Sequence, residues 1–213
     1  MGIRGAAPGD VSEIGLFPLP IVLLPTEEVP LHIFEDRYQE LIGECVEDDR
    51  EFGLVYADDD GIREVGTRAG VTEVLTRFED GRMNVVVEGH ERFRLLELTS
   101  GRSFQTGDVA AFSDEDDPAE SRSIERALQL FGRLRELTGS DVEIPPSDAQ
   151  QLSYALAARV ELASDVKQEL LQEVSERARL ERVCELLIGA AATFERRRRA
   201  AERAASNGRV DLG

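Results

Sequence analysis

Alternating apolar and polar positions in the first half of the chain predict short β-strands. In "RFRLLEL" (92–98) apolar residues alternate with arginines, so one strand face is expected to be buried and the other to contact water. Asp80-Gly81 favours a tight hairpin between two such segments. The predicted strands cover residues 52–57, 69–78, 83–89, 92–98 and 108–112. Antiparallel strands at this spacing are typical of a small barrel or sandwich.

The stretch "LFPLPIVLLPTEEVPLHIFEDRYQEL" (16–41) is apolar but is interrupted by prolines at positions 18, 20, 25 and 30. A proline donates no hydrogen bond to a β-ladder, so it is confined to strand starts, edges and bulges. We therefore expect a bent, crossing segment. Helical spacing follows and predicts one helix that covers part of the barrel, with its apolar side made of Phe34, Tyr38, Leu41, Ile42, Cys45 and Val46.

The second half of the chain has the 3.6-residue period of helices, and it begins after the acidic break "SDEDDPAES" (113–121). Ser147, with Gln150 three residues later, predicts a capped helix start. The predicted helices cover 120–138, 148–163, 165–174 and 176–204. The expected fold is thus α+β: a β-barrel domain over 10–113 with an inserted helix, a helical bundle over 119–205 that ends in a long helix, and a flexible tail over 206–213.

Charge narrows the range of partners. Asp and Glu number 43 against 25 Lys and Arg, for a net charge of −18, so the average surface repels nucleic acid and anionic membranes. The basic cluster "ERRRRAAER" (195–203) could form a patch for an acidic partner. A solvated helix end is the favoured interpretation, because cations complement the helix dipole and no second basic stretch accompanies it.

The positions of the two cysteines and the lack of an export signal both favour the cytoplasm as the compartment of this chain. Cys45 and Cys184 occupy apolar positions of predicted helices, where a core role in a reducing environment is expected. The apolar run 14–25 is too short and too rich in proline to span a bilayer, and it lacks a basic leader. We expect a soluble cytoplasmic protein.

No motif for catalysis or for a cofactor is recognisable. "DDDG" (58–61) resembles a calcium loop, but Tyr56 and Thr67 occupy two of its ligand positions, so a turn is expected, and no metal or cofactor is predicted. Zinc and P-loop motifs are absent. His32, Glu35 and His90 are the acid–base candidates for one open alternative, a hydrolase-type enzyme with its site in a barrel groove.

Three stretches together resemble the N-terminal substrate-binding domain of the Lon proteases, over roughly residues 14–190. They are "LFPLPIVLLPTEEVPLHIFEDRYQELI" (16–42), "VGTRAGVTEVLTRFEDGRMNVVVEGHERFRLLEL" (65–98) and "DVKQELLQEVSERARLERVCELL" (165–187). The resemblance implies a PUA-like antiparallel β-barrel followed by a helical bundle. Complete Lon enzymes continue into an ATPase module and a Ser-Lys protease domain. Because the sequence has neither the P-loop of an ATPase nor a Ser-Lys protease dyad, we expect a stand-alone, non-catalytic form.

The resemblance also implies that the chain binds unfolded or tagged protein segments, and we expect an extended segment to bind at an open strand edge in a groove at the barrel or between the barrel and the bundle. An RNA-binding role, suggested by the PUA-like barrel, is a further alternative that the negative charge disfavours. A separate ATPase or protease partner and a homodimer through the terminal helix are left open. Aromatic residues are expected to form core first, and an exposed patch of them would bind the segment. The candidate binding residues are Phe17, Leu31, His32, Phe34, Arg37, Tyr38, Arg92 and Phe93.

Overall fold

The structure is a computed structural model that describes residues 11–207. Its residues group into two compact units. The sheet unit comprises 11–116 and 157–174, and the helical unit comprises 117–156 and 175–207. The change of unit thus falls within the acidic break. The segment 157–174, which the sequence places in the bundle, groups with the sheet instead.

The sheet unit combines a seven-stranded, mostly antiparallel sheet with two helices. Hydrogen bonds follow a ring from β1 through β7, β6, β5 and β3 back to β1, and only the β1–β3 pairing is parallel. This confirms the predicted antiparallel sheet with an inserted helix, whereas a PUA-like barrel stays a prediction. The elements are β1 (Val11–Leu19), β2 (Glu28–Ile33), α1 (Asp36–Asp48), β3 (Phe52–Asp58), β4 (Gly61–Ile62), β5 (Val65–Arg77), β6 (Met83–Thr99), β7 (Thr106–Ala111) and α4 (Ser164–Gln172).

The proline-rich opening forms two strands rather than one crossing segment. Pro18 lies within β1 beside Val55 of β3, and Pro30 lies in β2, which pairs only with β6 among the described residues. Pro30 thus occupies an edge strand, where its missing donor is tolerated. The turn between the two strands is held against Gly89, whose N–H donates to the Glu27 carbonyl at 2.9 Å. A Cβ at Gly89 would collide with the Leu24 carbonyl oxygen, so only glycine fits there.

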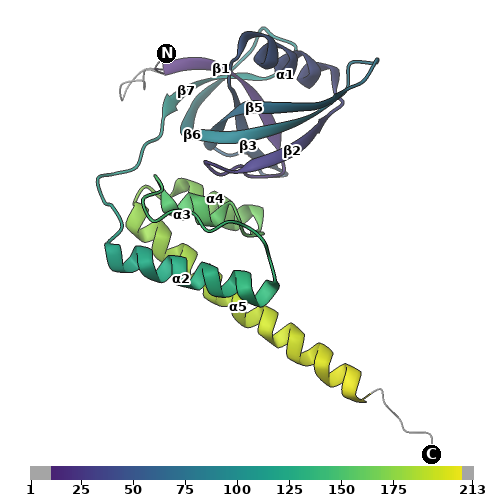
Figure 1. Cartoon of the computed structure of the whole chain (residues 1–213). Helices are drawn as coiled ribbons and strands as arrows, with labels where there is room; N and C mark the ends of the chain where they lie inside the picture. The colour runs from purple at the N-terminus through teal and green to yellow at the C-terminus, as the bar shows by residue number, and fades with distance from the viewer. Residues whose placement is uncertain (1–10, 208–213) are drawn as a thin grey trace, which may run out of the picture. The chain divides into compact units, whose positions relative to one another are not determined.

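Helix α1 covers one side of the sheet and closes the main core (Figure 1). Tyr38, Leu41, Ile42 and Cys45 of the predicted face are buried and Val46 is partly buried, whereas Phe34 precedes the helix and is exposed, so its predicted place on this face is wrong. The ring of Tyr38 lies 4.1 Å from that of Phe17, centroid to centroid. A smaller cluster surrounds Phe93 on the other side of the sheet. The predicted burial of both cysteines is confirmed. The main core is built from both strand and helix residues, among them Ile33, Ile42, Phe52, Leu54 and Val85.

Helix α4 is tied to the sheet by polar contacts in addition to its buried leucines. Lys167, the only lysine of the chain, forms an ion pair with Glu27, and both side chains are largely buried. Gln168 donates its side-chain N–H to the Val65 carbonyl at 3.0 Å. These contacts explain why an amphipathic helix of the second half belongs to the sheet unit.

The helical unit is built around α2 (Ser121–Thr138) and α5 (Glu176–Asn207), which run side by side (Figure 1). Their predicted ranges are close to the observed ones. Most of the predicted tail 206–213 lies outside the described residues, and its first two residues belong to α5. No helix within residues 11–207 is long and apolar enough to cross a membrane. The buried apolar side chains of this pair include Ala127, Phe131, Leu134, Leu180, Val183, Cys184 and Leu187.

The predicted helix 148–163 is wrong in its extent and in its cap. α3 (Leu152–Ala157) has six residues and follows Gln151, whose φ of 54° lies in the left-handed region. Its early N–H groups are satisfied from a distant part of the chain, because the Ser153 N–H donates to the Glu176 carboxylate at 3.0 Å. A tertiary cap therefore replaces the local one expected at Ser147.

Candidate functional site

Three aromatic rings gather on the exposed face of the sheet unit at the end of the β5–β6 hairpin. The His32 ring is stacked on Phe34, with centroids 5.9 Å apart and planes 20° apart, and it meets Phe78 edge-on at 6.3 Å. Phe34 is 60% exposed and Phe78 39% exposed. We call His32, Phe34 and Phe78 the aromatic patch. Exposed aromatic rings that gather in this way are typical of a contact surface.

The local sequence explains why these rings come together. In β2 the side chains alternate, so Ile33 is buried while its neighbour His32 faces water. The Asp80-Gly81 turn returns the chain so that the Phe78 N–H donates to the Arg82 carbonyl at 2.8 Å. Gly81 has φ of 90°, which glycine adopts without strain. The predicted hairpin is thus confirmed, and it places Phe78 next to β2.

Neighbouring polar groups orient the patch. His32 Nδ1 lies 2.6 Å from Asn84 Oδ1, on the adjacent strand β6, so a ring N–H donates to the amide oxygen. The Arg82 guanidinium lies 5.2 Å from the centre of the Phe78 ring. The Gln39 side chain donates to the Phe34 carbonyl at 3.0 Å. The first two contacts orient the His32 and Phe78 rings, and the third fixes the backbone at Phe34.

An open strand edge adjoins the patch. Among residues 11–207, β2 pairs with β6 alone, which leaves backbone groups on its other edge without a strand partner. Such an edge can accept an extended chain as an additional strand. Leu31, in the same strand, is half-buried and packs against the main core. Backbone hydrogen bonds and aromatic contacts are therefore available next to each other.

The remaining candidate residues lie apart from the patch. Phe17, Tyr38 and Phe93 are buried, the first two in the main core and Phe93 in the smaller cluster. Arg37 is exposed, pairs with Glu35 at 2.8 Å and lies over the Tyr38 ring. Burial raises the pKa of the Tyr38 hydroxyl above its usual value. The candidate binding residues chosen from the sequence thus include both core and surface residues.

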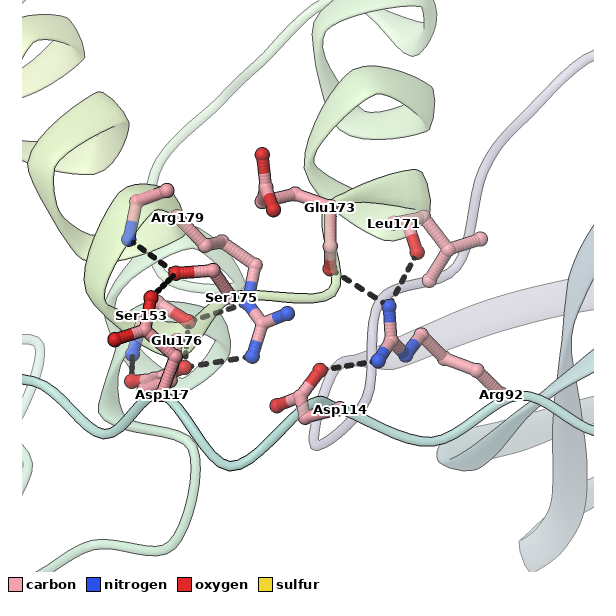
Figure 2. A network of polar contacts seen from close by, with 10 residues as sticks. Arg92, Asp114, Asp117, Ser153, Leu171, Glu173, Ser175, Glu176 and Arg179 are labelled. Carbon is pink, nitrogen blue, oxygen red and sulfur yellow. Dashed lines mark hydrogen bonds and ion pairs between the residues drawn. The ribbon is translucent and has the colours of Figure 1, made fainter. Parts of the chain in front are cut away.

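Arg92 is a buried structural residue. Its Nη1 donates to the carbonyls of Leu171 at 2.7 Å and Glu173 at 2.8 Å, and its Nη2 pairs with Asp114 (Figure 2). Only 4% of the residue is exposed. These bonds fasten the end of α4 to β6, within the sheet unit.

The helical unit has a polar cluster of its own (Figure 2). The buried Arg179 donates from Nε to the Ser153 hydroxyl at 2.7 Å and pairs with Glu176 at 2.6 Å. Hydrogen bonds from Arg177 and Ser175 to Asp117 hold the pKa of that carboxyl below its usual value. Since these charges satisfy one another, the cluster fits a structural role.

Two adjoining cavities of the sheet unit, of about 430 and 400 Å³, flank the turn between α1 and β3. Cys45, Arg50 and Glu51 line both. His90 lines the second cavity and lies 2.7 Å from Glu51. His32 belongs to the aromatic patch and to neither of these cavities, so the acid–base group considered from the sequence is not brought together in them.

The thiol of Cys45 is expected to react slowly. Burial raises its pKa to about 11, so about one thiol in a thousand is ionised at pH 8, against about one in ten for an ordinary thiol. We expect labelling with a disulfide reagent at pH 8 to be about 100-fold slower than in urea. The same shift removes stability as pH rises from about 9 to about 11, because the unfolded chain loses its proton first. Equal labelling rates in the folded and unfolded chain would contradict the assignment.

Comparison with known proteins gives the context of this geometry. Residues 13–189 match the family described as the ATP-dependent protease La (LON) substrate-binding domain. The chain is 26% identical over 179 residues to Lon protease 1 of Hydrogenovibrio crunogenus, and the aligned region covers 76% of this chain and 22% of that protein. It is 28% identical over 207 residues to the Lon protease of Brucella suis, and the aligned region covers 85% of this chain and 25% of that protein. The chain spans about a quarter of the length of these curated relatives.

Solved structures show the same fold. The Lon N-terminal domain protein from Xanthomonas campestris superposes with a TM-score of 0.64 at 27% identity, covering 81% of this chain and 96% of that one. The N-terminal domain of the Mycobacterium avium complex Lon protease also gives a TM-score of 0.64, at 18% identity, covering 85% and 98%. At that identity the second likeness concerns the fold alone.

Proposed function

Because the chain belongs to the family of ATP-dependent protease La (LON) substrate-binding domains, we propose that the aromatic patch and the open edge of β2 bind unfolded or tagged segments of client proteins. The observation that carries this proposal is the exposure of Phe34 and Phe78 around His32, beside an edge strand. An extended segment would add backbone hydrogen bonds along β2 and place apolar side chains against the rings. The chain would hold such a segment without altering it.

The free energy for such binding would come mainly from apolar area. Removing a largely exposed phenylalanine ring from water is worth roughly 1–2 kcal/mol, at about 25 cal/mol per Å². The two phenylalanines together would therefore strengthen binding by at least about ten-fold. The net charge of −18 favours basic segments and raises their association rates.

Transfer of a bound segment to a separate ATPase or protease partner is part of this proposal. The motifs for ATP hydrolysis and for Ser-Lys proteolysis are absent from the sequence. The two other candidate functions gain no specific support. For the hydrolase-type enzyme, His32 lies beside Asn84 and His90 beside Glu51, so these two histidines do not share a polar neighbour among residues 11–207. For RNA binding, the net charge of −18 opposes contact with the phosphate backbone.

A pair of phenylalanine substitutions tests the proposed site. We expect the double variant Phe34→Ser and Phe78→Ser to bind a fluorescent peptide with two phenylalanines at least about ten-fold more weakly, because the exposed rings supply the contact area. Fluorescence anisotropy measures the affinity, and the same peptide with serines in place of its phenylalanines measures non-specific binding. Both rings are exposed, so the melting temperature should hardly change.

Leu96→Ser is the matched control, because Leu96 is 53% exposed on the distant half of β6. It should leave the affinity unchanged. An equal loss in this control and in the double variant would refute the aromatic patch as the binding site.

A further inference from the structure

The larger of the two adjoining cavities of the sheet unit is lined by arginines and by apolar residues. Three guanidinium groups line it, those of Arg50, Arg68 and Arg102, and the Arg102 group lies 4.6 Å from the centre of the Phe104 ring. At about 430 Å³ the cavity is within the size range of small-ligand sites. Its apolar lining comes from Ile14, Leu41 and Phe104. A group that fits would be small, anionic at one end and aliphatic at the other.

Two of the three arginines already have carboxylate partners. Arg50 lies 3.6 Å from Glu44 and 3.4 Å from Asp48. Arg102 pairs with Glu44 and lies 3.6 Å from Glu40. These pairs leave little uncompensated positive charge on that side of the cavity.

Arg68 differs from the other two. Its Nη2 donates to the Ser12 hydroxyl at 2.9 Å, and within residues 11–207 it forms no ion pair. The side chain is half-buried, and a guanidinium group carries five N–H donors. The other carboxylates of the cavity are engaged elsewhere, Glu13 with Thr99 and Glu51 with His90, each at 2.7 Å. A half-buried guanidinium that forms no ion pair within residues 11–207 is a favourable place for an incoming anion.

Arg68 lies beside an irregularity of the sheet. The β5–β6 register slips between Thr67 and Ala69, so that Arg68 alone lies opposite two residues of β6, His90 and Glu91. The extra residue of this bulge thus belongs to β6, and bulges are frequent beside binding sites. Arg68 lines the first cavity, and His90, on the bulged strand, lines the second.

We propose that this cavity binds a carboxylate group of a client segment, with Arg68 as its ionic partner and the apolar lining residues in contact with the adjoining aliphatic atoms. This inference rests on the proposed function for the nature of the ligand. A single negative charge matches Arg68, the one guanidinium of the cavity that forms no ion pair with another residue of the described range 11–207. The carboxylates of Glu13 and Glu51 would repel a doubly charged phosphate about twice as strongly as a singly charged carboxylate. The carboxylate could belong to a chain end or to an Asp or Glu side chain.

Peptide titrations on the unmodified chain test the proposal and separate the two sources. The probes are acetyl-Ala-Ala-Leu with a free carboxylate, its amide, acetyl-Ala-Glu-Ala-amide and acetyl-Ala-Gln-Ala-amide, followed by NMR. We expect at least one of the two carboxylate peptides to bind about ten-fold more tightly than its neutral counterpart. A preference for the first identifies a chain end, and a preference for the second an acidic side chain. Equal affinities within both pairs would overturn the proposal.

Substitution of Arg68 locates the bound carboxylate. Arg68→Gln should weaken binding of the preferred carboxylate peptide about ten-fold, and its melting temperature reports whether it folds. Arg63→Gln is the control, because Arg63 is a partly exposed arginine that pairs with Asp58 at 2.7 Å outside the cavity. Undiminished binding by a folded Arg68→Gln variant would overturn the proposal, and the titrations on the unmodified chain decide it if that variant does not fold.

The double phenylalanine variant distinguishes this inference from the proposed function. It should lose affinity for the phenylalanine peptide and keep its preference for the carboxylate peptide. Failure of the proposed function would leave the carboxylate preference intact without any phenylalanine-dependent binding. Failure of the present inference would leave phenylalanine-dependent binding without any carboxylate preference.

Discussion

Replacement of Arg179 by alanine is expected to destabilise the helical unit by about 3–5 kcal/mol. The Arg179 side chain is fully buried, and its removal leaves the largely buried Glu176 carboxylate without that cation. The Ser153 hydroxyl would lose its hydrogen bond from Arg179, and the face of the Tyr154 ring would lose a guanidinium 4.0 Å from its centre. Amide hydrogen exchange in α2 and α5 measures the effect within this unit.

Arg182→Ala is the matched control for this prediction. Arg182 lies in the same helix, is 45% exposed and pairs with Glu185 at 3.0 Å. An exposed pair of this kind contributes about 0–1 kcal/mol. Similar losses in the Arg179 and Arg182 variants would contradict a structural role for the buried charge. Adding Glu176→Gln to an Arg179→Met variant should restore part of the stability, because no unpaired charge is then buried.

Replacement of Arg92 by alanine should have an effect of similar size in the sheet unit, about 3–5 kcal/mol. The largely buried Asp114 carboxylate loses this partner, and two carbonyls at the end of α4 lose a charged donor. Hydrogen exchange should increase first in α4. Peptide affinity at the aromatic patch should be unchanged under conditions where the variant remains folded, since Arg92 is buried away from it.

Arg94→Ala controls for the loss of an arginine next to Phe112. Both Arg92 and Arg94 lie 4.8 Å from the centre of that ring, but Arg94 is 46% exposed. The control should cost about 1 kcal/mol or less. A folded Arg92 variant that loses peptide affinity by ten-fold or more would return Arg92 to the binding residues.

Local signals in the sequence identified much of the fold. The Asp80-Gly81 turn fixed the β5–β6 hairpin, because a residue with positive φ is required there. The helical spacing of Tyr38, Leu41 and Ile42 correctly identified the buried face of α1. Both features depend on residues close together in the chain, where pattern and structure agree most directly.

Features set by distant residues were not predictable in the same way. The sequence was divided into strands 83–89 and 92–98, whereas β6 is one strand with an irregular register near His90. The alternation is broken there by the bulge, which resembles a strand end in the sequence. The start of α3 depends on Glu176, far along the chain, and could not be recognised from Ser147.

The candidate site illustrates the same limit. The stretch 16–42 directed attention to His32 and Phe34, which both lie on the aromatic patch. It could not separate them from the buried Tyr38, because aromatic residues serve equally as core and as contact surface. Phe78 was missed, since it was assigned to a strand. Its position next to the hairpin turn was the available signal for an exposed ring.

Amide hydrogen exchange of the unmodified chain, with and without the phenylalanine-containing peptide, tests the proposed binding surface most directly. We predict slower exchange in β2 and in the hairpin segment 75–82 when the peptide is bound, because these segments carry the open edge and the rings. Protection confined to the helical unit, with none in these two segments at saturating peptide, would contradict it.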